Sequence, residues 1–161
     1  MAYLLDSDVL IRAKRDHYRF GTFPCFWDWV RAKSDEGIVR SVVAIQQEVL
    51  NGGDELATWI RDLNEMFLAP DEATANAARR LSAWAQGPAR IYTPAALAEF
   101  FASGDYWLIA HASAHDFTVV TMELPAPLAQ RRVKIPDACN GVGVAWVNPF
   151  EMLEREGASF V

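Results

Sequence analysis

Short apolar runs alternate with segments of helical periodicity along most of this chain. The apolar run Tyr3–Leu5 ends in the polar sequence Asp6-Ser7-Asp8, after which Val9, Leu10 and Ala13 recur at helical spacing. This pattern predicts a buried strand, then a polar turn, then a helix. Such a unit is typical of α/β proteins, in which a strand leads into a helix that packs on the sheet.

The same alternation continues toward the C-terminal end. We predict further short strands at Ile38–Val39, Phe67–Leu68, Phe117–Thr121 and Val133–Ile135. We predict further helices at Phe26–Lys33, Val42–Leu50, Asp54–Asn64, Asp71–Ala85 and Gly104–Ala114, and after Pro94 and Pro149, with Ser41 and Asp54 as N-caps. Strands alternating with helices predict an α/β fold, a three-layer α/β/α sandwich around a central, mainly parallel sheet.

The length and composition fit one globular domain over residues 1–161. About half of the residues are apolar (52%), which is enough for a sizeable core, and neither an internal repeat nor a linker interrupts the pattern. No apolar run approaches the roughly 18 residues of a membrane span, and no signal-peptide pattern opens the chain. We therefore expect a cytoplasmic protein with no membrane partner.

The formal net charge of −6 argues against broad electrostatic attraction to nucleic acid or to an anionic membrane. Two small basic patches stand out against this acidic background. They contain Arg12, Lys14, Arg15 and Arg19 in one case and Arg131, Arg132 and Lys134 in the other. These side chains could contact phosphates if the fold brings them to one rim, and ordinary solvated surface is the alternative interpretation.

Carboxylates follow three of the predicted strands, where an open α/β sheet binds its ligands. Asp6 follows its strand directly, and Glu123 and Asp137 follow theirs after one intervening residue. Glu48 borders the apolar face of one predicted helix, and Asp105 begins another. Carboxylates gathered at one edge repel each other unless a cation neutralises them, and Mg²⁺ and Mn²⁺ prefer oxygen ligands. The pattern predicts a divalent metal site, although each acid alone also fits a helix cap, a helix flank or a loop surface.

Four segments in this order resemble the PIN-domain ribonucleases. They are Leu4–Ile11, the isolated Glu48, Gly104–Ala110 and Val119–Glu123, and the resemblance spans nearly the whole chain. Further stretches resemble the VapC-like, stand-alone PIN proteins of bacterial toxin–antitoxin operons: Arg12–Lys14, Phe23–Pro24, Phe26–Trp29 and Lys134–Asp137.

This resemblance implies a function and a set of site residues. The acidic quartet Asp6, Glu48, Asp105 and Glu123 would bind one or two Mg²⁺ or Mn²⁺ ions and cut RNA with a metal-activated water. Candidate RNA contacts are Arg12, Lys14, Arg15 and Lys134. A toxin of this type would have a cognate antitoxin protein as its partner, and a homodimer is a further expectation.

Two positions depart from the PIN pattern, and a few residues are candidates for an outer shell around the metal. Glu123 stands where many relatives carry Asp, and Asp8 stands where Asn or Ser is common. Asp8, Thr121 and Asp137 are the outer-shell candidates, because groups behind the ligands orient them and their waters. His111 and His115 lie one helical turn apart, but they have no third ligand nearby and are not assigned to a metal.

Two other functions remain open from the sequence. The opening Asp6-Ser7-Asp8-Val9 also resembles haloacid-dehalogenase-like phosphatases, in which Asp6 would be the nucleophile and Asp8 the acid/base. That alternative leaves Asp105 without a role. The chain could instead be a non-catalytic binding module with the PIN fold. Repulsion between the four crowded acids would then reduce stability without serving a function.

Overall fold

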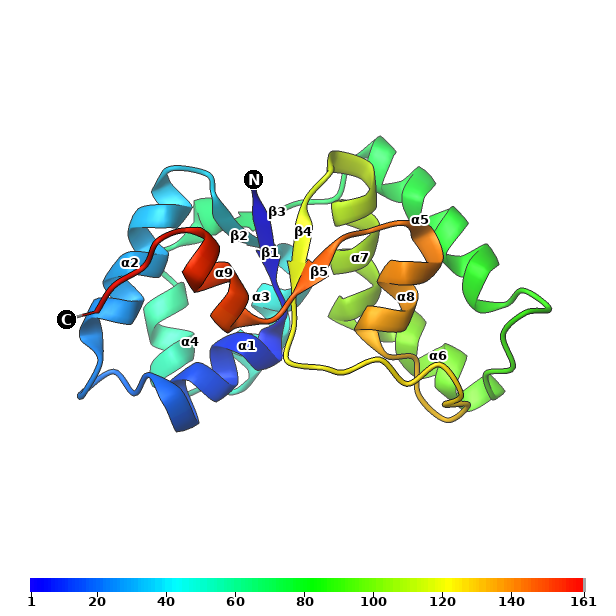
Figure 1. Ribbon diagram of the computed structural model, residues 1–161, viewed down its shortest axis with the longest axis horizontal. Coiled ribbons are helices and arrows are strands. Elements are labelled where there is room, and N and C mark those ends of the chain that lie inside the picture. The colour runs from blue at the N-terminus through cyan, green and yellow to red at the C-terminus, as the bar shows by residue number, and fades with distance from the viewer. Residues whose placement is uncertain (161) are drawn as a thin grey trace.

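The computed structural model describes residues 1–160 and contains a five-stranded sheet at its centre (Figure 1). The strands are all parallel and lie in the order β3-β2-β1-β4-β5. They are β1 (Tyr3–Leu5), β2 (Val39–Val42), β3 (Phe67–Leu68), β4 (Thr118–Val120) and β5 (Trp146–Val147). The central β1 and its neighbour β4 are buried along their whole length, as expected for a parallel sheet covered on both faces.

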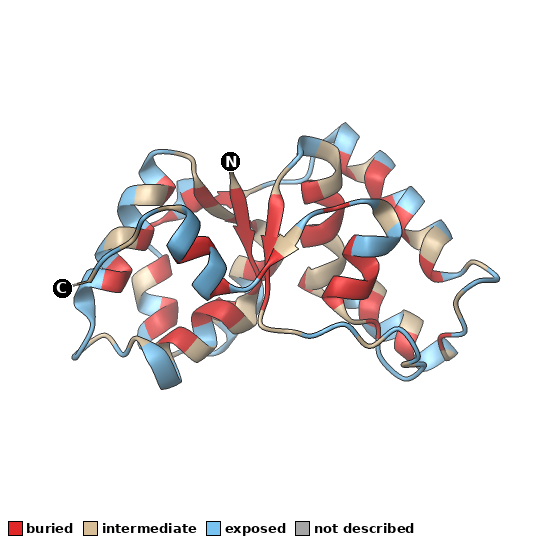
Figure 2. Ribbon diagram, in the orientation of Figure 1, coloured by how far each residue is buried: buried red, intermediate tan, exposed pale blue. Residues whose placement is uncertain are grey.

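Helices flank this sheet on both sides, with α2, α4 and α9 on one side of Figure 1 and α5, α7 and α8 on the other. Their bounds are α1 (Ser7–Arg12), α2 (Pro24–Asp35), α3 (Val43–Asn51), α4 (Glu55–Ile60), α5 (Glu72–Ala85), α6 (Pro94–Ala102), α7 (Gly104–His115), α8 (Ile135–Val142) and α9 (Pro149–Arg155). A π-helical turn (Ala13–His17) extends α1, and a 3-10 turn (Asn64–Met66) precedes β3. Figure 2 shows the buried residues of these helices gathered toward the sheet. The predicted three-layer α/β/α class is confirmed.

Side-chain capping explains two of the predicted helix starts and not a third. The Asp54 and Asp71 carboxylates accept hydrogen bonds from Ala57 N (3.1 Å) and Thr74 N (2.8 Å), so both residues cap their helices. The helix after Asp54 ends at Ile60. The prediction of Ser41 as an N-cap is wrong. Ser41 is a buried residue of β2, and its hydroxyl donates to Leu5 O (2.6 Å) on the neighbouring strand.

The predicted strand Val133–Ile135 is also wrong. Ile135 is the first residue of α8, where Pro136 fits because the first helical turn needs no backbone N–H. The fifth strand is the two-residue β5, Trp146–Val147, which the apolar pattern did not indicate. Asp137 therefore lies in the first turn of α8 rather than beyond a strand. No helix among residues 1–160 has both the length and the apolar character that a membrane crossing needs.

Candidate active site

An acidic cleft of about 510 Å³ opens where β1 and β4 end. The backbone enters it at Asp6, whose N–H donates to Val120 O (3.1 Å) on the last residue of β4. Helices α3 and α7 supply further acids. The charged residues that line the cleft are Asp6, Asp8, Arg12, Glu48, Glu99, Asp105, Glu123, Arg132 and Lys134. The fold thus brings together four acids that lie up to 117 positions apart in the chain, Asp6, Glu48, Asp105 and Glu123.

Asp6 is the most deeply buried of these acids, at 3% exposure. Among residues 1–160, the hydrogen bonds of its carboxylate are two long contacts, with Ser7 Oγ and Thr121 Oγ1, both at 3.5 Å. Burial raises the pKa of Asp6 well above its usual value, and the negative charges of Asp105, Glu123 and other cleft acids raise it further. A carboxylate so poorly satisfied by the protein is well suited to a cation.

Glu48 is held in place by the start of α7. Its Oε1 accepts from the Gly104 backbone N–H (2.7 Å), and its Oε2 accepts from Ser7 Oγ (3.0 Å). A Cβ at position 104 would lie 2.7 Å from Ile45 Cδ1 and 2.8 Å from Glu48 Oε1. Glycine at this position therefore lets α7 approach α3 closely enough to fix the Glu48 carboxylate.

Asp105 follows immediately and faces the same acidic surroundings. Burial raises its pKa to about 7, with further increases from Glu123 and Glu48, while the Arg132 guanidinium lowers it. The two adjacent residues Gly104 and Asp105 thus have separate roles, one in holding Glu48 and one in presenting a carboxylate to the cleft.

Glu123 closes the opposite wall through the segment that joins β4 to α8. Its Oε2 accepts from the Ile135 N–H (3.2 Å), and Arg132 approaches its Oε1 at 3.5 Å. The backbone N–H of Glu123 donates to Thr121 Oγ1 (3.1 Å), which links the Glu123 backbone to a buried residue that also contacts Asp6. Glu123 is therefore anchored through its backbone as well as its side chain.

The other candidate residues divide into those that reach the cleft and those that do not. Asp8, Arg12 and Lys134 line it. Lys14 is instead paired with Asp54 (2.7 Å) and Arg15 with Asp16 (3.0 Å), and neither lines the cleft. Asp137 does not line the cleft either, because its Oδ2 accepts from Ala126 N (2.8 Å) and so holds the segment before α8.

Four polar residues of the cleft were not among the site candidates from the sequence: Ser7, Glu99, Ser103 and Arg132. Arg132 belongs to a basic patch that the sequence shows, but the patch alone could not indicate that Arg132 reaches the cleft with Lys134 while Arg131 does not line it. Ser7 lies between the predicted ligand Asp6 and the outer-shell candidate Asp8, and its hydroxyl donates to Glu48 Oε2 (3.0 Å). Glu99 carries no sequence signal that separates it from other helical acids.

The donor set fits a hard divalent ion, although the side chains would have to adjust to hold one. Among residues 1–160, no three His, Cys, Asp or Glu side chains are already arranged around a common ion position. Oxygens of Glu48 and Glu123 are occupied by N–H donors instead. All the cleft acids nevertheless offer oxygen, the ligand that Mg²⁺ and Mn²⁺ prefer, and the raised pKa of Asp6 marks negative charge that lacks compensation.

Comparisons with known proteins identify a family and a fold. Residues 3–160 match the family described as domain of unknown function DUF4411. No curated protein matches the sequence. Among solved structures, a chain of VapBC2 from Rickettsia felis, bound to a DNA fragment from its promoter, is similar with a TM-score of 0.59 and 12% identity, over 92% of this chain and 98% of that one. At this identity the likeness shows the fold, which is PIN-like as the sequence predicts.

Proposed function

The chain belongs to the DUF4411 family, and we propose that it is a Mg²⁺- or Mn²⁺-dependent endoribonuclease, the toxin of a toxin–antitoxin pair. One observation carries this proposal. Four acids from separate parts of the chain line a cleft at the carboxyl edge of the sheet, and the deepest of them, Asp6, has no donor nearer than 3.5 Å among the described residues. Crowded carboxylates of this kind destabilise a protein unless they bind a cation.

The ion would be held by Asp6, Asp105 and Glu123, with Glu48 as a further ligand or as the group that orients a coordinated water. When bound, such an ion lowers the pKa of water and stabilises the negative charge that develops on a phosphate during hydrolysis. The chain itself supplies the positions of these oxygens. Gly104 N–H and Ile135 N–H fix one oxygen each of Glu48 and Glu123. The second oxygens contact the Ser7 hydroxyl (3.0 Å) and Arg132 (3.5 Å), which a bound ion would have to displace or share.

Three cations at the cleft supply contacts for the substrate. Arg12, Arg132 and Lys134 line the same hollow as the acids, so phosphates flanking the scissile one can approach positive charge. In the part of the chain that the structure describes, Arg132 has one long polar contact, to Glu123 (3.5 Å), so its guanidinium can turn toward a phosphate. Lys14 and Arg15, which are paired with Asp54 and Asp16, stay candidates for weaker contacts beyond the cleft.

Two further considerations support RNA as the substrate and an antitoxin as the partner. The four sequence segments resemble the PIN-domain ribonucleases, and the acids of those segments are the ones that converge. The similar chain in the Rickettsia felis structure is part of VapBC2. We propose by analogy that this chain has a cognate antitoxin, acts in the cytoplasm and forms a homodimer.

The proposal is tested by incubating the purified protein with defined single-stranded and hairpin RNAs in Mg²⁺, Mn²⁺ or EDTA. We expect internal cleavage that requires the metal and falls at least about 100-fold in Asp6→Asn and in Asp105→Asn, because each change removes a ligand. Asp62→Asn is the matched control, since Asp62 is an exposed acid outside the cleft. Cleavage that survives both cleft substitutions unchanged would show that a contaminant or another site does the chemistry.

A further inference from the structure

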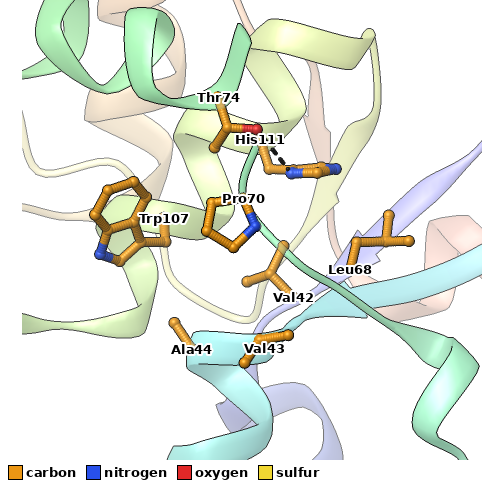
Figure 3. A pocket seen from close by; sticks show the side chains of 8 residues that line it. All are labelled: Val42, Val43, Ala44, Leu68, Pro70, Thr74, Trp107 and His111. Atoms are coloured by element: carbon orange, nitrogen blue, oxygen red, sulfur yellow. Dashed lines mark hydrogen bonds between the residues drawn. The ribbon is translucent and has the colours of Figure 1, made fainter. Parts of the chain in front are cut away.

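A second hollow, of about 190 Å³, lies where β2 and β3 end (Figure 3). Val42 and Leu68 are the last residues of those strands, and α3, α5 and α7 complete the walls. The residues that line it are Val42, Val43, Ala44, Leu68, Pro70, Thr74, Trp107 and His111. None of them carries a formal charge when His111 is neutral, and most are apolar, so this pocket differs in kind from the acidic cleft.

A chain of hydrogen bonds fixes which nitrogen of His111 carries a proton. Asp71 Oδ1 accepts from the Thr74 N–H and from Thr74 Oγ1, both at 2.8 Å. Thr74 Oγ1 also lies 3.1 Å from His111 Nδ1. The Thr74 hydroxyl has one hydrogen, which it donates to the Asp71 carboxylate. The hydroxyl oxygen must therefore accept a hydrogen bond from His111 Nδ1–H. His111 is therefore the tautomer that has a lone pair on Nε2.

That lone pair has no partner in the part of the chain that the structure describes. His111 is 95% buried, and none of the hydrogen bonds among residues 1–160 involves its Nε2. Burial lowers the pKa of His111, which favours the neutral ring. The pocket thus presents one fixed acceptor in otherwise apolar surroundings. Solvent can reach this Nε2, which is not one of the fully enclosed polar atoms that lack a partner, and a ligand donor can replace a water molecule there.

We propose that this pocket binds a small, neutral aromatic molecule that donates one hydrogen bond to His111 Nε2. The volume suits one ring with a substituent, because an apolar cavity of about 150 Å³ in another protein holds benzene. Trp107 offers an aromatic wall for the ring, and the aliphatic side chains of Val42 and Leu68 offer apolar contact. A charged molecule would lose its hydration here without gaining a counter-ion.

This site goes beyond the proposed nuclease function and can be tested separately from it. The apolar pocket and the acidic cleft share no lining residue. Binding to the pocket can therefore be measured without RNA or metal, and its presence or absence does not depend on whether the cleft cleaves RNA.

Phenol, toluene and benzoate are the probes, titrated in EDTA while the ¹⁵N resonances of His111 and the indole N–H of Trp107 are followed by NMR. Phenol and toluene have similar shapes, but only phenol has a donor, and benzoate is charged. We expect saturable shifts of the Trp107 indole N–H with both phenol and toluene, a shift of the His111 Nε2 resonance with phenol alone, and no binding of benzoate. The absence of saturable shifts with phenol and toluene would overturn the proposal.

Two substitutions test the location of the site and the role of its acceptor. In His111→Phe, the ring volume is kept but the acceptor is lost, so the ratio of phenol affinity to toluene affinity should fall about fivefold, the value of one ordinary hydrogen bond. An unchanged ratio would exclude the role of Nε2. Ala44→Phe fills the pocket and should abolish binding of both probes, and it covers the case in which His111→Phe does not fold.

A further arm distinguishes a free molecule from a ring presented by a polypeptide. N-acetyltyrosinamide carries the same phenol ring on a peptide backbone, and we expect it to bind at least about tenfold more weakly than phenol because the pocket has room for little beyond one ring. Equal or tighter binding of N-acetyltyrosinamide would contradict the small-molecule assignment and point to a protein side chain as the occupant.

Discussion

The acidic cleft and the apolar pocket lie at the same carboxyl edge of one parallel sheet, yet their chemistry is opposite. The cleft follows β1 and β4, where the chain continues into Asp6 and toward Glu123, and the pocket follows β2 and β3, where it continues into Val43 and toward Pro70. The strand ends determine where hollows form, as is general for α/β sheets. The residues directly after each strand determine what each hollow can bind.

Two carboxylates show the same contrast. Asp71, beside the pocket, has a pKa lowered to about 2, mainly because the Thr74 N–H and hydroxyl donate to it. Asp105, in the cleft, has a pKa raised to about 7, because it is buried among other carboxylates. One acid is satisfied by the protein and contributes to its structure. The other is left unsatisfied, which is what a site reserved for a cation requires.

The largest effect outside the carboxylates themselves should come from Gly104→Ala. The new Cβ would press on Ile45 and on Glu48 Oε1, so we expect a loss of stability of roughly 1–3 kcal/mol and a loss of RNA cleavage of about 10–100-fold as Glu48 is displaced. Urea denaturation and the cleavage assay measure these two changes.

Gly21→Ala is the control for this change, because a Cβ at Gly21 would meet nothing within 4 Å. If Gly104→Ala kept both the stability and the cleavage rate of the wild type, the close approach of α7 to Glu48 would not be needed, and this part of the account would be wrong.

The next effect concerns stability and pH in the absence of metal. Because the pKa of Asp105 is about 7 in the folded state and near 3.9 in the unfolded chain, the folded state binds more protons between these values. Stability from this group is therefore lost as the pH rises toward 7 and above. Asp105→Asn does not titrate, so in EDTA it should exceed the wild type by up to about 4 kcal/mol at pH 8 and match it near pH 4.

Urea denaturation of both proteins across this pH range gives the comparison, with Asp62→Asn as the variant that should follow the wild type. A variant Asp105→Asn that is no more stable than the wild type at pH 8 would show that the carboxylates are not crowded enough to disfavour their own ionisation.

The smallest effect should come from Asp8→Asn. Asp8 lines the cleft but is not one of the four proposed ligands, so RNA cleavage should stay within about fivefold of the wild type. In a haloacid-dehalogenase-like phosphatase Asp8 would be the acid/base, and its loss would abolish nearly all turnover. Hydrolysis of a small phosphate monoester, measured beside RNA cleavage, completes the distinction between these two enzymes.

Much of the fold was predictable because apolar runs and capping residues act locally. Tyr3–Leu5 and the segment before Thr121 are strands for reasons visible in the sequence, and Asp54 and Asp71 cap the helices that follow them. The error at Val133–Ile135 arose because a short apolar run before a proline is buried equally well as a helix start. The strand β5 was not predicted, although β3 is equally short and was predicted at Phe67–Leu68.

The site was predictable where it depends on the ends of strands and not where it depends on tertiary contacts. Asp6 and Glu123 follow predicted strands and do reach the cleft. Asp137 was placed beside them only through the wrong strand, and its carboxylate holds the Ala126 backbone instead. The position of Arg132 among the acids, and the pairing of Lys14 with Asp54, depend on how distant segments pack.

Thermal melting of the metal-free protein with and without Mn²⁺ tests most directly whether the convergent acids form a cation site. With Mn²⁺ at about 100 times its dissociation constant, the wild type should gain about 2.7 kcal/mol, which raises Tm by several degrees, and Asp6→Asn and Asp105→Asn should lose most of that gain while Asp62→Asn keeps it. An equal Tm in Mn²⁺ and in EDTA for the wild type, or an equal gain in all four proteins, would contradict the account.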